Sequence, residues 1–157
     1  IAVTPIQLAS AISVIANGGY LMKPYIVDKI TTWEGEEIKR FSPIVVRKVI
    51  NNRTCEYMKD ALRYVVTDGT GKRANSTKYE FCGKTGTAQM ANPKGGYYDN
   101  RYYATFIGFA PKEEPRIAIV VMAKNPHPVY FGGSVGGPTF KKIAERTLEY
   151  LESNRWR

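Results

Sequence analysis

The chain has 157 residues, 43% of them hydrophobic and 24% charged, and its formal net charge is +9. This length fits one domain with a moderate core, and the composition is that of a globular protein. No apolar run is long enough to span a bilayer. Residues 38–55 contain five basic residues and no acidic one, a pattern that fits an anionic partner but favours a solvated basic surface. We therefore expect no nucleic-acid partner.

The first predicted element is a helix that opens at Thr4. Threonine is a good N-cap, Pro5 suits the first helical position, and Gln7 completes a capping box. The pair Gly18-Gly19 is expected to end this helix as a left-handed cap. Its buried face is predicted to contain Leu8, Ile12 and Ile15.

A peripheral hairpin and a second helix are predicted next. Residues 25–32 and 36–41 are typical of two strands around a turn, and residues 44–50 form another short extended segment. Asn52 is a plausible cap for a helix over residues 53–66, which the glycine-rich residues 68–71 end. The buried face expected for this helix contains Met58, Ala61, Leu62 and Val65.

Three strands with short connections are predicted in the second half, over residues 78–90, 101–110 and 116–124. Short connections favour an antiparallel meander. Every residue of 117–123 is apolar, so we expect this strand to be buried on both faces, with helices covering both sides of the sheet. The predicted fold class is α+β.

A final helix is predicted to begin at Pro138, after a flexible glycine-rich lead. Mixed charges on its polar face favour packing on the sheet over a membrane surface. Its apolar face is expected to contain Phe140, Ile143, Ala144, Leu148 and Leu151.

The cysteines and the histidine show no metal-binding spacing, and we expect neither a metal nor another cofactor. Cys55 and Cys82 are the only cysteines, and we expect them to be free buried thiols, although sequence leaves a disulfide open. His127 lies in a proline-rich loop and is interpreted as structural.

The strand around residues 81–89 carries the strongest chemical signal, Gly83-Lys84-Thr85-Gly86-Thr87. Because side chains alternate along a strand, Thr85 and Thr87 should share one face and Lys84 should lie on the other. From spacing alone, a functional edge and a polar strand with a glycine bulge are both open. A phosphate-binding loop is disfavoured, since Lys78 occupies the position where that motif requires glycine.

A Lys-Thr-Gly strand is one of three motifs in serine acyl-transferases that handle β-lactams. The stretches around this strand resemble the transpeptidase domain of penicillin-binding proteins, most closely the monofunctional, class B type. They follow the family's order over nearly the whole chain, at residues 4–19, 68–71, 83–88, 106–111 and 133–140.

The resemblance implies the β-lactamase/transpeptidase-like fold, in which helices cover both faces of a five-stranded antiparallel sheet, with three of the strands present here. It implies catalytic roles for Lys84, in the electrostatics around the nucleophile, and for Thr87, whose backbone N–H would be an oxyanion donor. It also implies that Thr85, Gly86 and Thr87 bind substrate, with the threonines holding a carboxylate and Gly86 leaving the strand edge open.

The chain departs from the family pattern in one respect. No serine has lysine three positions on or asparagine two positions on, so the Ser-x-x-Lys and Ser-x-Asn motifs are missing. We expect residues 1–157 to be the C-terminal portion of a single transpeptidase domain whose nucleophile belongs to an upstream portion. The fragment should be inactive alone, and the edge of its strand 116–124 should be unpaired and prone to self-association.

For the parent protein, the resemblance implies peptidoglycan stem peptides and β-lactams as ligands and cell-wall synthesis proteins as partners. It also implies a membrane anchor in the bacterial cell membrane and an extracytoplasmic catalytic domain. A β-lactamase-type serine hydrolase of the same superfamily and a non-catalytic binding module remain alternatives.

Overall fold

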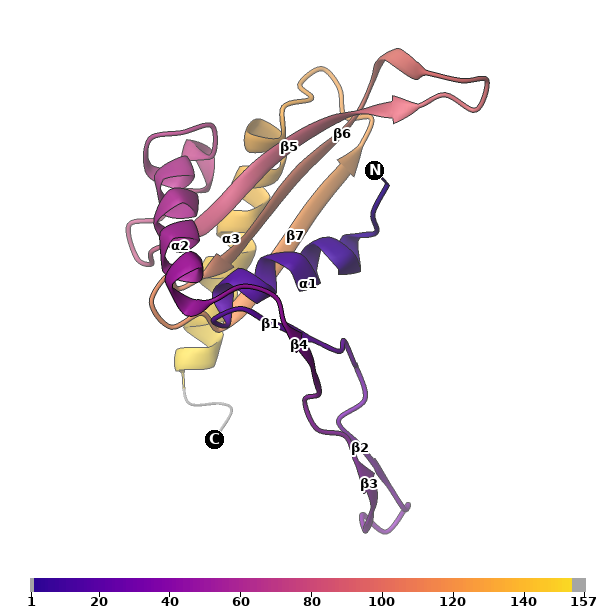
Figure 1. The fold of residues 1–157 in the computed structure, drawn as a ribbon, viewed down its shortest axis with the longest axis vertical. Coiled ribbons are helices and arrows are strands. Elements are labelled where there is room, and N and C mark those ends of the chain that lie inside the picture. Colours follow the sequence, from indigo (N-terminus) through magenta and orange to yellow (C-terminus); the bar gives the residue numbers. More distant parts are fainter. Residues whose placement is uncertain (1, 154–157) are drawn as a thin grey trace.

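The computed structural model describes residues 2–153, and its centre is an antiparallel sheet of order β5-β6-β7 (Figure 1). Helix α1 crosses one face of this sheet, and α3 lies against the other (Figure 1). The meander and the two covering layers confirm the predicted α+β class. The elements in chain order are α1 (Pro5–Ala16), β1 (Tyr20–Met22), β2 (Lys29–Thr31), β3 (Glu37–Arg40), β4 (Val45–Lys48), α2 (Asn52–Thr67), η1 (Lys72–Ala74), β5 (Cys82–Ala91), β6 (Tyr97–Ala110), β7 (Ile117–Lys124) and α3 (Gly132–Glu152).

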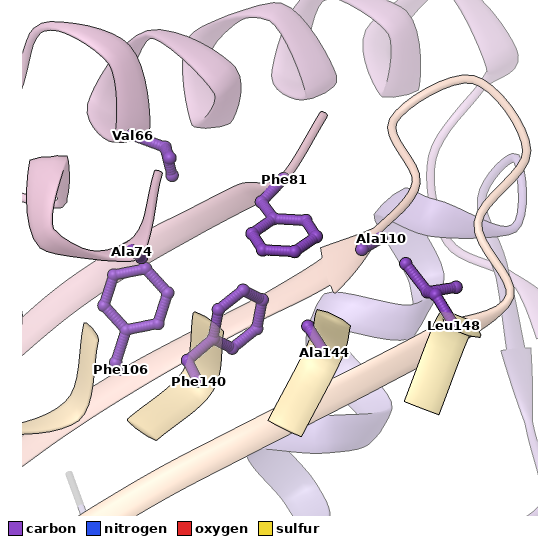
Figure 2. Close-up of a cluster of buried hydrophobic side chains, with 8 residues drawn as sticks. All are labelled: Val66, Ala74, Phe81, Phe106, Ala110, Phe140, Ala144 and Leu148. Atoms are coloured by element: carbon purple, nitrogen blue, oxygen red, sulfur yellow. The ribbon is translucent and has the colours of Figure 1, made fainter. Parts of the chain in front are cut away.

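Each face of the sheet has its own hydrophobic cluster, because successive side chains of β5 and β6 point to opposite sides. On the α3 side, Phe106 and Phe140 meet with ring centroids 4.9 Å apart. Figure 2 shows this cluster, which consists of Val66, Ala74, Phe81, Phe106, Ala110, Phe140, Ala144 and Leu148. On the α1 side the buried residues are Ile12, Leu62, Cys82 and Phe109.

The first helix forms as predicted. Gln7 N donates to Thr4 Oγ1 at 3.4 Å, and Thr4 N donates to Gln7 Oε1 at 2.8 Å, which completes the capping box. Gly18 and Gly19 have φ angles of +83° and +104°, so the left-handed cap is confirmed. The prediction missed strand β1, which pairs with β4 within the extended segment predicted at 44–50.

Helix α2 is rotated by one residue relative to the prediction. Its N-cap is Asn51, whose side chain accepts from Thr54 N at 2.8 Å, and not Asn52. Met58 and Ala61 are exposed rather than buried. Lys59 is buried instead, and its ammonium pairs with Glu56 at 3.0 Å, which offsets the cost of burying the charge. The residues that α2 buries are Cys55, Lys59, Leu62 and Val66.

Helix α3 begins at Gly132, so the predicted flexible lead before Pro138 is wrong. A Cβ on Gly136 would lie 2.7 Å from Phe106 Cβ, which shows how closely the first turns approach the sheet. The glycines are therefore used for close packing rather than for flexibility. Ile143, predicted to be buried, is 43% exposed.

Several strand boundaries also differ. Strand β5 begins at Cys82 rather than at residue 78. Before it, backbone groups bond to side chains: Lys78 N donates to Ser76 Oγ at 3.1 Å, and the Phe81 carbonyl accepts from Arg63 Nη1 at 3.2 Å. Strand β6 begins at Tyr97, which leaves only residues 92–96 as a turn. Strand β7 is not buried throughout, since it is an edge strand and Met122 is 44% exposed.

The β2–β3 hairpin projects from the rest of the chain (Figure 1) and is shorter than predicted, since residues 25–28 are not in a strand. Arg40 contacts both Glu37, at 2.7 Å, and Asp28, at 3.3 Å. Cys55 and Cys82 are free and buried, as expected. Across residues 2–153, every helix is too short or too polar to cross a bilayer.

Candidate active-site strand

Strand β5 carries the Lys-Thr-Gly motif along one edge of the sheet. Among residues 2–153 it pairs only with β6, with Lys84 opposite Ile107, Thr85 opposite Phe106 and Thr87 opposite Ala104. Phe106 belongs to the α3-side cluster, so Thr85 and Thr87 point toward α3 and Lys84 points toward α1. The structure therefore places these three side chains as their alternation predicts.

The Lys84 side chain curls over the strand edge. Its Nζ donates to the Thr85 carbonyl at 2.9 Å and to Thr85 Oγ1 at 3.4 Å. A cleft of about 200 Å³ opens beside it and brings Lys84, Thr85 and Gly86 together. The other residues that line this cleft are Leu8, Thr105 and Ile107.

Each threonine hydroxyl of the motif has a partner from a distant part of the sequence. Thr85 Oγ1 lies 2.7 Å from Thr70 Oγ1, in the loop that follows α2. Thr87 Oγ1 accepts the N–H of Gly132 at 3.2 Å. Helix α3 has no side-chain cap from its own N-cap residue, so Thr87 satisfies one of its first N–H groups.

Glycines allow α3 to come this close to β5. A Cβ on Gly132 would lie 2.3 Å from the carbonyl oxygens of Gly86 and Thr105. A Cβ on Gly133 would lie 2.1 Å from the Thr70 carbonyl oxygen. Both positions exclude any side chain, so the start of α3, the 68–71 loop and β5 meet backbone to backbone.

The backbone of β5 also presents polar groups to the open edge. In an antiparallel pair, the N–H and C=O of one residue point the same way, and this direction alternates along the strand. The Thr85 carbonyl accepts from Lys84 Nζ at 2.9 Å, which indicates that the polar groups of Thr85 face the open edge. By the same alternation, the N–H of Thr87 faces this edge.

Cys82, two residues before Lys84, is not a candidate nucleophile. Its Sγ is fully buried and donates to the Lys59 carbonyl at 3.4 Å. This burial raises the pKa of the Cys82 thiol to about 12, so the reactive thiolate is scarce at neutral pH.

A larger groove, of about 590 Å³, lies between α1, β1 and β4, away from the motif. Its walls are mainly aliphatic, with Val14, Ile15, Leu21 and Val46 among them. None of the motif residues lines this groove, so the larger groove and the motif are separate features of the surface.

Sequence reasoning missed two groups that contact the motif threonines, the Thr70 hydroxyl and the Gly132 N–H. Both lie in glycine-rich stretches that the sequence marked as turns or leads. Their composition was a signal, but their contacts are with residues 15 and 45 positions away, which periodicity cannot show.

Comparison with known proteins gives one family. The family model described as "Penicillin binding protein transpeptidase domain" matches residues 1–145. Stage V sporulation protein D of Bacillus subtilis is 38% identical over 156 residues, which are 96% of this chain and 24% of that protein. A peptidoglycan D,D-transpeptidase FtsI homolog of Mesostigma viride is 30% identical, with 94% of this chain and 27% of that protein covered.

Solved structures of penicillin-binding proteins also match this chain. The crystal structure of penicillin binding protein 3 from Mycobacterium tuberculosis, complexed with ampicillin, matches with a TM-score of 0.85 and 32% identity. The match covers 96% of this chain and 35% of that one. The chain thus spans about a quarter of the length of the curated relatives, 24% of the sporulation protein for example. These matches confirm the resemblance and the β-lactamase-like fold expected from the motifs.

Proposed function

Because the chain belongs to the penicillin-binding protein transpeptidase family, we propose that it forms the C-terminal portion of a peptidoglycan D,D-transpeptidase domain. This portion contributes the Lys-Thr-Gly strand β5, which forms one wall of the cleft. The observation that carries this proposal is the meeting of Lys84, Thr85 and Gly86 around one cleft at an open strand edge. The upstream portion supplies the nucleophilic serine.

In the proposed reaction, the serine attacks a carbonyl of a stem peptide, an amine leaves, and the acyl-enzyme is then transferred to the amine of a second stem peptide. The Thr87 N–H lies on the open edge, where it can donate to the oxyanion of the tetrahedral intermediate. Gly86 adds no side chain to obstruct that approach. Thr85 and Thr87 hold the ligand carboxylate, and Lys84 supplies the positive charge beside it.

β-Lactams acylate the same serine in this proposal. Solved relatives include penicillin binding protein 3 of Mycobacterium tuberculosis complexed with ampicillin and with aztreonam. The proposal places the whole protein at the bacterial cell membrane, with its catalytic domain on the extracytoplasmic side and other cell-wall synthesis proteins as partners. The sporulation and FtsI-type names of the relatives support a role in cell-wall synthesis.

Labelling with a fluorescent penicillin tests this function. The chain of residues 1–157 alone should take up no covalent label, because it contains no Ser-x-x-Lys nucleophile. The full-length protein should be labelled on an upstream serine, as read by gel fluorescence and peptide mapping. A full-length protein that stays unlabelled would refute the proposal, and rapid loss of the label would favour a β-lactamase-type hydrolase.

We also expect the isolated chain to self-associate through the edge of β7. This strand is unpaired on its outer side among residues 2–153 and is mainly aliphatic, which makes it a template for another strand. Sedimentation at micromolar concentration should show species larger than a monomer. Met122→Lys should reduce association by adding charge at this edge, and Met58→Lys, on α2, should not. A monomer at all concentrations contradicts this expectation.

A further inference from the structure

The hydroxyl pair of Thr70 and Thr85 is a feature that the proposed chemistry leaves unexplained. The two oxygens are 2.7 Å apart, although they lie 15 residues apart in the sequence. Thr85 lines the cleft, and Thr70 lies behind it, where Gly133 approaches both Thr70 O and Thr85 Cγ2 closely. The pair therefore sits where a ligand carboxylate would meet Thr85.

Either hydroxyl of the pair can donate, and the choice determines whether the Thr85 proton is available to a ligand. A threonine hydroxyl has one proton and two lone pairs, and an ammonium group can only donate. Lys84 Nζ lies 3.4 Å from Thr85 Oγ1, so it occupies one lone pair of that oxygen. If Thr70 donates to the second lone pair, the Thr85 proton is left for an anionic ligand. If Thr85 donates to Thr70, no proton remains for the ligand.

We propose that Thr70 is a positioning residue, which donates to Thr85 and thereby aims the Thr85 proton at the carboxylate of the bound ligand. This inference rests on the proposed transpeptidase function, since it needs an anionic ligand in the cleft. It adds a residue outside the Lys-Thr-Gly motif to the set that determines carboxylate recognition.

The loop that carries Thr70 is held in a fixed position, as this role requires. Gly69 N donates to the Tyr64 carbonyl at 3.0 Å, and Gly71 N donates to the Val65 carbonyl at 2.9 Å. These bonds fix the loop on both sides of Thr70 to the end of α2. A Cβ on Gly133 would lie 2.1 Å from Thr70 O, so the first turn of α3 closes on the loop from the other side. The backbone thus fixes the position from which the hydroxyl donates.

The neighbouring threonine is arranged in the same way. The Gly132 N–H can only donate, and it occupies a lone pair of Thr87 Oγ1 at 3.2 Å. Thr85 and Thr87 therefore each receive a donor from another element, which leaves both hydroxyl protons for an anion. Of these two donors, only that of Thr70 belongs to a side chain and can be removed by substitution.

The test uses the full-length protein and two probes, a fluorescent penicillin and its methyl ester, which lacks the negative charge. Thr70→Val keeps the shape and removes the hydroxyl, and Thr70→Ser keeps the hydroxyl. We expect Thr70→Val to lower the acylation rate constant with the free-acid penicillin roughly five- to tenfold, the effect of one neutral hydrogen bond. The rate with the ester should change less than twofold, and Thr70→Ser should restore the free-acid rate.

The double variant shows whether Thr70 acts through Thr85. In a Thr85→Val background, Thr70→Val should cause no further loss, because the hydroxyl that it positions is gone. Equal losses on both probes, additive losses in the double variant, or a Thr70→Val rate equal to wild type would each overturn the inference. A wild-type protein that takes up no label would instead refute the proposed function, and the inference with it.

Discussion

Replacing Lys84 by alanine is expected to lower the acylation rate of the full-length protein by penicillin at least about 100-fold, the scale of losing one preorganised electrostatic partner of a transition state. The ammonium bonds the Thr85 carbonyl at 2.9 Å and lies beside the Thr85 hydroxyl at 3.4 Å. Its loss removes the positive charge from the cleft and also a donor to Thr85. The measurement is the second-order acylation rate with a fluorescent penicillin.

Two further variants make this result specific. Lys29→Ala, on the projecting hairpin, removes the same charge from the protein and should leave the rate unchanged. Lys84→Arg keeps the charge but changes its shape, and it should recover only part of the rate, because a planar guanidinium does not replace a compact ammonium. A Lys84→Ala protein that is labelled as fast as the Lys29→Ala protein would remove Lys84 from the site.

Gly132→Ala is expected to destabilise the protein by about 3 kcal/mol, at the upper end of the usual range for overpacking. The added methyl would lie 2.3 Å from the carbonyl oxygens of Gly86 and Thr105, and neither backbone can move without disturbing the β5–β6 pairing. The start of α3 must therefore shift away from Thr87. Thermal unfolding of the full-length protein and penicillin labelling should both report the damage.

Gly137→Ala is the matched control within the same helix. Its nearest contact would be 3.3 Å, to Ala74 N, and alanine favours the helix over glycine by about 1 kcal/mol. We expect a small change of either sign in the melting temperature and normal labelling. A Gly132→Ala protein as stable as Gly137→Ala would contradict the close packing of α3 on β5.

The sequence predicted the elements whose signals are local. The capping box of Thr4 and Gln7, the break at Gly18-Gly19 and the three-strand meander depend on neighbouring residues, and the structure has all of them. Strand β1 was missed because three residues give no measurable alternation, and its pairing with β4 is not local. The start of α3 was misplaced because its glycines argue against a helix locally, and only contact with β5 explains them.

The same distinction between local and non-local signals applies to the candidate site. Lys84, Thr85 and Thr87 follow from alternation along one strand, and the structure places them on the predicted faces. The groups that orient them, Thr70 and Gly132, come from a loop and a helix that only the fold brings to this strand. The sequence alone therefore could not predict that Thr70 and Gly132 lie beside this strand.

The structure of the cleft does not depend on the projecting β2–β3 hairpin. Gly35 has open space around it, and Trp33 is 95% exposed at the hairpin tip. Neither buried cluster includes a hairpin residue, so shortening or lengthening this arm would not repack the layers that hold β5. The hairpin tip should therefore accept an inserted peptide tag or fluorophore without loss of penicillin labelling.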